Sequence, residues 1–222
     1  MPPPQDPSTM PQGFRLAQLI AARICHDLGG PVGTVEGALS LLGAGSDEAM
    51  AVAREGAAAL RQRLTLFRAA WGGGLGDATL AELLALLDGQ VAGGRARLAV
   101  AEGLSPGTAF AAPVAQLMLN AVLLAGDALP RGGVVLLGGD PSGVLMVRPE
   151  GEGAAWPPGL AAALAAGGLD PRRAADPRAV RAPALAALAA DLGVPLALGL
   201  GGPGDAGPAP LLIGPAPPPP AA

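Results

Sequence analysis

Residues 22–32, ARICHDLGGPV, contain the only histidine of this 222-residue chain and lie inside a long helical pattern. Around that stretch, apolar residues recur at the spacing of one helix face: Leu16, Ile20, Ile24, Leu28, Val35, Leu39 and Leu42. Gly43 and Gly45 then end the pattern, because glycine readily takes the left-handed conformation that closes a helix. The stretch therefore predicts one helix over residues 14–42, with His26 near its middle.

A second helix is predicted directly after the first, from Ser46 to Trp71. Ser46 is suited to cap it, and Asp47 and Glu48 place negative charge in the first turn, where the helix dipole favours it. Its apolar residues keep helical spacing to the end: Leu60, Leu64, Phe67 and Trp71. A short connection makes the two helices antiparallel neighbours. Two helices cannot cover both apolar stripes, so we favour a homodimer that completes a four-helix bundle; the alternative is a hairpin packed on its own chain.

His26 falls on the side of the first helix that faces away from its apolar stripe. At about 100° per residue, the stripe covers roughly 140° and His26 lies almost opposite its centre. Gly30, Gly33 and Gly37 fall within about 40° of His26, although a glycine inside a helix costs about 1 kcal/mol. Such glycines are typical of a surface that another protein's backbone approaches closely. The alternative is a surface histidine without a role.

The side chains around His26 suit phosphoryl transfer. Imidazole is partly neutral at pH 7, so it can attack phosphorus, and it passes the group onward readily. Asp27 is placed to orient the ring or accept a proton, and Arg23 to pair with phosphoryl oxygens. Exposed residues of the same helix, Leu19 among them, are expected to contribute to docking.

The rest of the chain predicts a mixed domain. Helices are expected near 79–90, 112–127, 159–166 and 179–192, and strands near 96–101, 133–138, 143–148, 194–199 and 209–213. Residues 139–142, Gly-Asp-Pro-Ser, are typical of a hairpin turn between two of these strands. We predict an α+β domain in which helices cover one face of a mostly antiparallel sheet.

Composition excludes several kinds of site and partner. The chain has one cysteine and no lysine, and its 14 cations are arginines spread along the sequence. A disulfide framework and a phosphate-loop lysine are therefore excluded, and nucleic acid is not an expected partner. A single histidine beside a single cysteine also rules out most metal sites, and we expect none. No uninterrupted apolar span of membrane length and no signal peptide stand in the sequence, so we expect a cytoplasmic protein without membrane contact.

The stretch around His26 resembles the H-box of dimeric histidine kinases, where an acidic residue follows the phospho-accepting histidine and a proline stands five residues on. His26, Asp27 and Pro31 match those places. With residues 116–125, QLMLNAVLLA, and 128–133, ALPRGG, the order of elements over 14–213 resembles the ChpT-type histidine phosphotransferases of alphaproteobacteria.

The resemblance implies a domain organisation in four parts. Residues 14–74 form the dimerisation hairpin that bears His26, and residues 77–213 form an α/β sandwich like the ATPase domain of histidine kinases. Pro-rich residues 1–13 and 214–222 are expected to be disordered arms.

The ATP site of that domain is expected to be degenerate. Asn120 matches the asparagine that holds Mg²⁺–ATP in the kinases, but Pro149 stands where their adenine-binding aspartate should be, before Gly151 and Gly153. Proline offers no side-chain acceptor for the adenine amine. Residues 154–183 also lack a G-x-G phosphate loop. We therefore predict that nucleotide binding is lost and that Asn120 is a relic or a structural cap.

The function that the resemblance implies is a phosphorelay step in cell-cycle signalling. His26 accepts phosphate from a receiver-domain aspartate of a hybrid histidine kinase and passes it to the receivers of response regulators, which dock over Leu19, Gly30, Gly33 and Gly37. The protein needs no cofactor of its own, since Mg²⁺ is expected on the receiver. The alternatives are an ATP-dependent sensor histidine kinase and an adaptor that binds receivers without chemistry.

Overall fold

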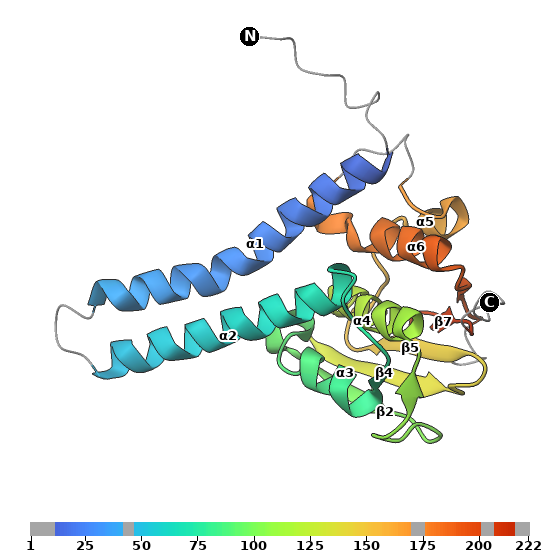
Figure 1. The fold of residues 1–222 in the computed structure, drawn as a ribbon, viewed down its shortest axis with the longest axis horizontal. Helices are drawn as coiled ribbons and strands as arrows, with labels where there is room; N and C mark the ends of the chain where they lie inside the picture. Colours follow the sequence, from blue (N-terminus) through green and yellow to red (C-terminus); the bar gives the residue numbers. More distant parts are fainter. Residues whose placement is uncertain (1–11, 42–46, 170–175, 201–206, 216–222) are drawn as a thin grey trace, which may run out of the picture.

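The computed structural model describes residues 12–41, 47–169, 176–200 and 207–215. Two long helices, α1 (Gln12–Leu41) and α2 (Asp47–Trp71), form an antiparallel hairpin that projects from a mixed domain (Figure 1). Both predicted helices are confirmed. The predicted connection with its Ser46 cap, and the predicted disordered arms except for residues 12–13 and 214–215, lie outside the described residues.

The hairpin helices pack tightly against each other near Pro31, which α1 contains within its length. Gly56 of α2 faces this region, and a Cβ atom there would lie only 2.9 Å from Cγ2 of Val35. Only glycine gives α2 the room to pack this tightly against α1. The axis of α1 changes direction near its middle (Figure 1), as expected where a proline removes a helical hydrogen bond.

The mixed domain is built on a five-stranded sheet of order β2-β4-β5-β7-β6. Its strands are β2 (Ala96–Val100), β4 (Gly133–Gly139), β5 (Leu145–Glu150), β7 (Leu211–Ile213) and β6 (Leu196–Leu198). Only the β2–β4 pair is parallel. The prediction of a mostly antiparallel α+β domain is therefore confirmed, including the hairpin from β4 to β5.

The helices of the domain are α3 (Leu80–Leu87), α4 (Ala112–Asp127), α5 (Leu160–Ala166) and α6 (Arg181–Leu192), with short 3₁₀ turns η3 (Val91–Gly94) and η4 (Pro177–Ala179). Thr79 begins α3 through a capping box with Glu82. A small second sheet pairs β1 (Ala78–Thr79) with β3 (Ala109–Phe110). This sheet was not predicted, because two-residue strands are too short to show an alternating pattern.

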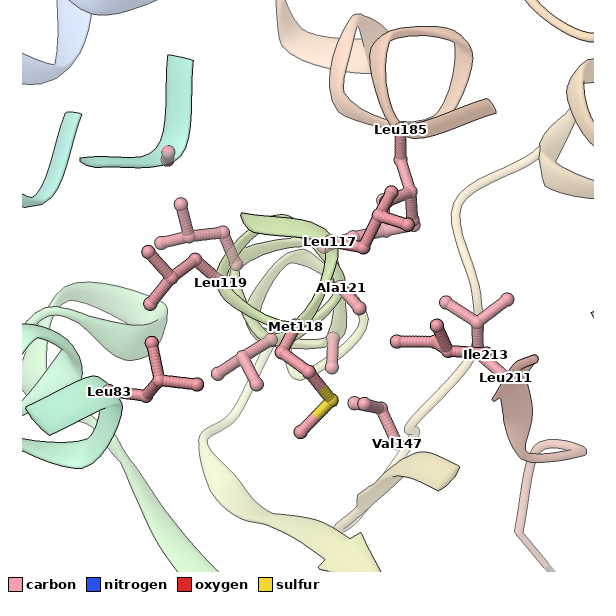
Figure 2. Packing of buried hydrophobic residues seen from close by; sticks show 14 of the residues in the cluster. Leu83, Leu117, Met118, Leu119, Ala121, Val147, Leu185, Leu211 and Ile213 are labelled. Carbon is pink, nitrogen blue, oxygen red and sulfur yellow. The ribbon is translucent and has the colours of Figure 1, made fainter. Parts of the chain in front are cut away.

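Helix α4 is the centre of the core. In Figure 2 its side chains point in several directions: Leu117 toward Leu185 of α6, Leu119 toward the side of α3, and Met118 toward Val147 of the sheet. Fully burying one such side chain contributes roughly 1.5–3 kcal/mol. The hydrophobic core around α4 also includes Leu66, Phe67 and Ala70 of α2, so it joins the hairpin to the mixed domain. Among the described residues no helix is long and apolar enough to cross a membrane.

Candidate functional site

His26 lies on the exposed side of α1, as its helical position predicts. Its side chain is 66% exposed, and the ring nitrogen Nδ1 lies 3.2 Å from Oδ1 of Asp27. No partner for the other ring nitrogen, Nε2, is found in the described part of the chain. The ring therefore has one nitrogen against a carboxylate and the other open to an incoming group.

Asp27 is held by arginines from two regions of the chain. Nε of Arg23, one turn earlier on α1, donates to both carboxylate oxygens at 3.0 and 3.1 Å. Nη2 of Arg181, at the start of α6, donates to Oδ2 at 2.9 Å. The side chains of Arg181 and Asp27 are only 11% and 15% exposed. Asp27 thus faces the mixed domain while its neighbour His26 faces solvent.

A second carboxylate closes the cluster. Oδ1 of Asp127, the last residue of α4, accepts from Nη1 of Arg181 at 2.6 Å and from Nη2 of Arg23 at 3.2 Å. Each arginine therefore bridges Asp27 and Asp127, and the four charges balance. We call Arg23, Asp27, Asp127 and Arg181 the ion cluster. It joins α1 to α4 and α6 directly beneath His26.

The two carboxylates of the ion cluster differ in protonation behaviour. Burial raises the pKa of Asp27, but the charges of Arg181 and Arg23 and their hydrogen bonds outweigh burial and leave that pKa below its usual value. Burial also raises the pKa of Asp127, and there the arginines offset it only in part. Asp27 is consequently a carboxylate at neutral pH, able to accept the Nδ1 proton of His26 in a hydrogen bond.

Pro31 prepares a further contact at Asp27. A proline has no N–H, so the backbone carbonyl of Asp27, four residues earlier, loses its helical donor. Nη1 of Arg63 on α2 donates to that carbonyl at 2.9 Å, and Nε of Arg63 donates to Oε1 of Gln90 at 3.1 Å. Pro31 thus frees a carbonyl of α1, next to His26, to accept a hydrogen bond from Arg63 of α2.

The structure separates the roles predicted for Arg23 and the glycines. The guanidinium of Arg23 is committed to Asp27, to Asp127 and, at 2.9 Å, to the carbonyl of Arg178; a phosphoryl group would have to displace one of these. Gly30, Gly33 and Gly37 are exposed, and a Cβ on any of them would meet nothing within 4 Å. Packing within the described part of the chain therefore does not require these glycines. Leu19 is half-buried.

A cavity of about 320 Å³ lies behind Asp27, between the hairpin and the mixed domain. Its charged lining comprises Arg23, Arg63, Arg95, Arg181, Asp27 and Asp127. His26 is not part of that lining. No group of three or more metal-binding side chains occurs in the part of the chain that the structure describes.

Comparison with known proteins identifies the mixed domain. The family model for the histidine phosphotransferase C-terminal domain matches residues 80–203, more than half of the chain. The chain belongs to the histidine phosphotransferase family. A solved structure of a bacterial phosphotransferase has a similar fold, with a TM-score of 0.70 at 21% identity over 93% of this chain and 98% of that one. No curated protein matches the sequence.

In this histidine phosphotransferase, Asn120 acts as a clamp between the two regions. Its amide nitrogen Nδ2 donates to the carbonyl of Ala70, in the last turn of α2, at 2.9 Å, and to the carbonyl of Gln116 at 3.0 Å. The amide of Gln116 donates to the same Ala70 carbonyl at 3.0 Å. Asn120 is the one buried polar residue among those described. Of the two interpretations that the sequence left open, these contacts favour the structural cap.

The other residues predicted for a degenerate nucleotide site lie away from that clamp. Pro149 is buried inside β5 opposite Val135, rather than after the end of the strand predicted over 143–148. Gly151 packs so closely on the turn after α4 that a Cβ would lie 2.6 Å from the carbonyl oxygen of Gly132. Gly153 has a positive φ of 68°. Asn120 contacts Ala70 of α2, whereas Gly151 lies against Leu129 and Gly132 in the turn after α4.

Sequence reasoning missed three residues of this histidine phosphotransferase that touch Asp27 or its partners: Arg63, Asp127 and Arg181. Pro31 carried a usable signal for Arg63, since the carbonyl that it frees requires a donor from elsewhere. No such signal exists for Arg181, which lies 154 residues from Asp27 in sequence. Its approach is a result of the tertiary fold alone.

Proposed function

We propose that this histidine phosphotransferase is a ChpT-type phosphorelay protein that works in the cytoplasm in cell-cycle signalling. His26 accepts a phosphoryl group from the receiver-domain aspartate of a hybrid histidine kinase and passes it to the receivers of response regulators. The observation that carries the proposal is an exposed imidazole whose Nδ1 lies against an ionised aspartate while Nε2 is open.

The chemistry follows from that pair. A proton on Nδ1, donated to Asp27, leaves the lone pair of Nε2 free for attack on phosphorus. The new P–N bond forms as the bond from phosphorus to the receiver's aspartyl oxygen breaks, and its electron pair leaves with the receiver carboxylate. The imidazolium that results is stabilised by Asp27. Transfer to the next receiver reverses these steps, with Mg²⁺ supplied by the receiver.

The docking surface that we propose for receivers is the face of α1 around His26, with Leu19, Gly30, Gly33 and Gly37. Among the described residues, nothing outside the backbone of α1 itself lies within 4 Å of a Cβ built at these three glycines, which supports this surface. A helix surface without side chains lets a second backbone come close to the imidazole.

We further propose that two hairpins form a four-helix bundle in a dimer, with two mixed domains of degenerate ATPase-like fold outside it. Large apolar side chains stay exposed on the hairpin, among them Phe14 (57%), Leu39 (51%) and Leu64 (42%). On the α1 wheel, Phe14 and Leu39 lie about 130° from His26. Met50, Ala57 and Leu64 recur every seven residues on α2, the spacing of a bundle seam. A dimer that covers this face leaves His26 open.

Transfer from a phosphorylated receiver tests the proposal. The wild-type protein, His26→Ala and the control Asp140→Asn, in the turn between β4 and β5, are each mixed with a receiver carrying labelled aspartyl phosphate. We expect the label on the wild-type protein and the control but not on His26→Ala. Equal labelling of all three would contradict the proposal. Labelling from ATP alone would favour a sensor kinase, and receiver binding without any phosphohistidine would favour the adaptor.

A further inference from the structure

The mixed domain contributes two charged side chains to the surroundings of His26. Arg181 comes from the start of α6 and Asp127 from the end of α4, and their side chains are 11% and 22% exposed. Neither lies on the hairpin, and neither touches the imidazole. Both act on it only through Asp27, which Arg181 contacts directly and Asp127 reaches through Arg181 and Arg23.

We propose that Arg181 and Asp127 are positioning residues for phosphoryl transfer, which fix the carboxylate of Asp27 so that His26 keeps its proton on Nδ1 and presents the lone pair of Nε2 to the receiver. The inference rests on the function proposed above. It gives the mixed domain a part in the chemistry that does not depend on nucleotide binding.

The geometry around Asp27 supports this role. An aspartate carboxylate turns easily about its last torsion angle, which has broad preferences. Here Nε of Arg23 spans both oxygens at 3.1 and 3.0 Å, and Nη2 of Arg181 adds a second donor on Oδ2 at 2.9 Å. The donors on Oδ2 leave Oδ1 directed at Nδ1 of His26, 3.2 Å away. Arg181 therefore decides which carboxylate oxygen faces the imidazole.

Asp127 has the complementary task of keeping the arginines in place. It accepts from Nη1 of Arg181 at 2.6 Å and from Nη2 of Arg23 at 3.2 Å, so both guanidinium groups are held at their far ends. The buried Nε of Arg181 has no partner among the described residues. Arg181 is thus oriented by its two terminal nitrogens: Nη2 donates to Asp27, and Nη1 donates to Asp127 and, at 3.4 Å, to the carbonyl of Leu123.

This arrangement allows phosphoryl transfer without a preceding proton transfer. Attack by Nε2 forms the P–N bond while the electron pair of the broken P–O bond leaves with the receiver's aspartate. The proton on Nδ1 stays shared with Asp27, so no proton has to move before the attack. A histidine that carries its proton on Nε2 instead has no lone pair facing the receiver, and it must exchange tautomers first.

The single histidine makes the test unusually direct. One ¹⁵N-labelled imidazole reports its own tautomer without interference from others. The wild-type protein, Arg181→Gln, Asp127→Asn and the control Arg148→Gln, whose guanidinium pairs with Glu150 on β5, are compared by the ¹⁵N shifts of Nδ1 and Nε2. Single-turnover transfer from a phosphorylated receiver is then measured over a range of receiver concentrations.

We expect the Nδ1–H tautomer in the wild-type protein and in Arg148→Gln. In Arg181→Gln and Asp127→Asn its fraction falls, and the maximal transfer rate falls about tenfold, while the receiver concentration for half-maximal rate stays within about twofold. Arg181→Lys, which keeps one donor to Asp27, recovers part of the rate. Should Arg181→Gln fail to fold, Asp127→Asn, which keeps the size of the side chain, decides.

Two results overturn the inference: a wild-type imidazole with its proton on Nε2, or folded variants with unchanged tautomer and rate. The outcome for the relay is separate. If no receiver phosphorylates the wild-type protein, the proposed function fails, whereas the tautomer measurement still reports whether the mixed domain positions His26. If transfer occurs equally in all variants, the relay stands and the positioning role is wrong.

Discussion

In α4, twelve of the 16 residues are buried, whereas Ala38 is the only buried residue among those described in the 30-residue α1. The same chain therefore contains one helix that is buried on nearly all sides and one that is largely exposed. The covered helix supplies the packing and, through Asp127, one end of the ion cluster. The bare helix carries His26. Under the function proposed above, the hairpin presents His26 to the receiver and the mixed domain holds Asp27 in place.

Truncation of a buried side chain should give the largest difference in stability between the two regions. We expect Leu117→Ala in α4, where the side chain is fully buried, to lower the free energy of unfolding by about 2–5 kcal/mol. Leu41→Ala at the end of α1, where the side chain is 64% exposed, should change it by less than about 0.5 kcal/mol. Urea denaturation of both variants measures the contrast. Similar losses would mean that α1 is covered in solution as fully as α4.

A charge placed on the exposed apolar face of the hairpin should weaken dimerisation. Leu39→Glu places a carboxylate on the face that we propose is covered in a dimer, and the lost burial of a leucine, about 1.5–3 kcal/mol, weakens association at least about tenfold. Leu41→Glu, which lies about 160° from Leu39 on the helix wheel, is the matched control. Sedimentation of the wild-type protein and the two variants measures their self-association. If the wild-type protein is a monomer, the proposed four-helix bundle is wrong.

The ion cluster that joins the two regions should make a pH-dependent contribution to the free energy of unfolding. We expect Asp27→Asn to lower the free energy of unfolding by about 1–3 kcal/mol at neutral pH, because charged hydrogen bonds to Arg23 and Arg181 are lost. Folding lowers the pKa of Asp27, so the unfolded chain binds its proton more tightly. The contribution is full above the unfolded pKa of about 3.9 and is lost as pH falls through the folded pKa.

Denaturation of the wild-type protein and Asp27→Asn across that acidic range measures the contribution. The stability difference between them should be constant from neutral pH down to about 5 and should shrink below about 4. A difference that grows as the pH falls would give Asp27 the opposite sign of pKa shift and contradict the geometry of the cluster.

The smallest expected effect is a gain in stability. Gly33→Ala adds a Cβ that meets nothing within 4 Å, and alanine is the better helix former by about 1 kcal/mol. We expect the variant to be more stable by up to that amount and yet slower in transfer, with a raised receiver concentration at half-maximal rate. Gly76→Ala, in the segment after α2, controls for a glycine outside α1. Unchanged transfer by Gly33→Ala would remove this glycine from the docking surface.

The periodic parts of the fold were predictable and the long-range contacts were not. The 3.6-residue spacing of apolar side chains predicted α1, α2 and α4 closely, and the exposed position of His26 followed from the same spacing. The partners of Asp27 did not follow, because nothing local marks Arg181 among the arginines of the chain. Pro149 was expected just after a strand over 143–148 and instead lies in β5, where β7 pairs only with residues 145–147, so a missing N–H is tolerated there.

The residue that carries phosphate after each of two incubations distinguishes a relay protein from a kinase. The wild-type protein is incubated once with ATP alone and once with a phosphorylated receiver without ATP, and the acid-labile phosphate is mapped along the chain. We expect phosphate on His26 in the second incubation and none in the first. Phosphate on another residue, or on His26 from ATP alone, would contradict the proposed function.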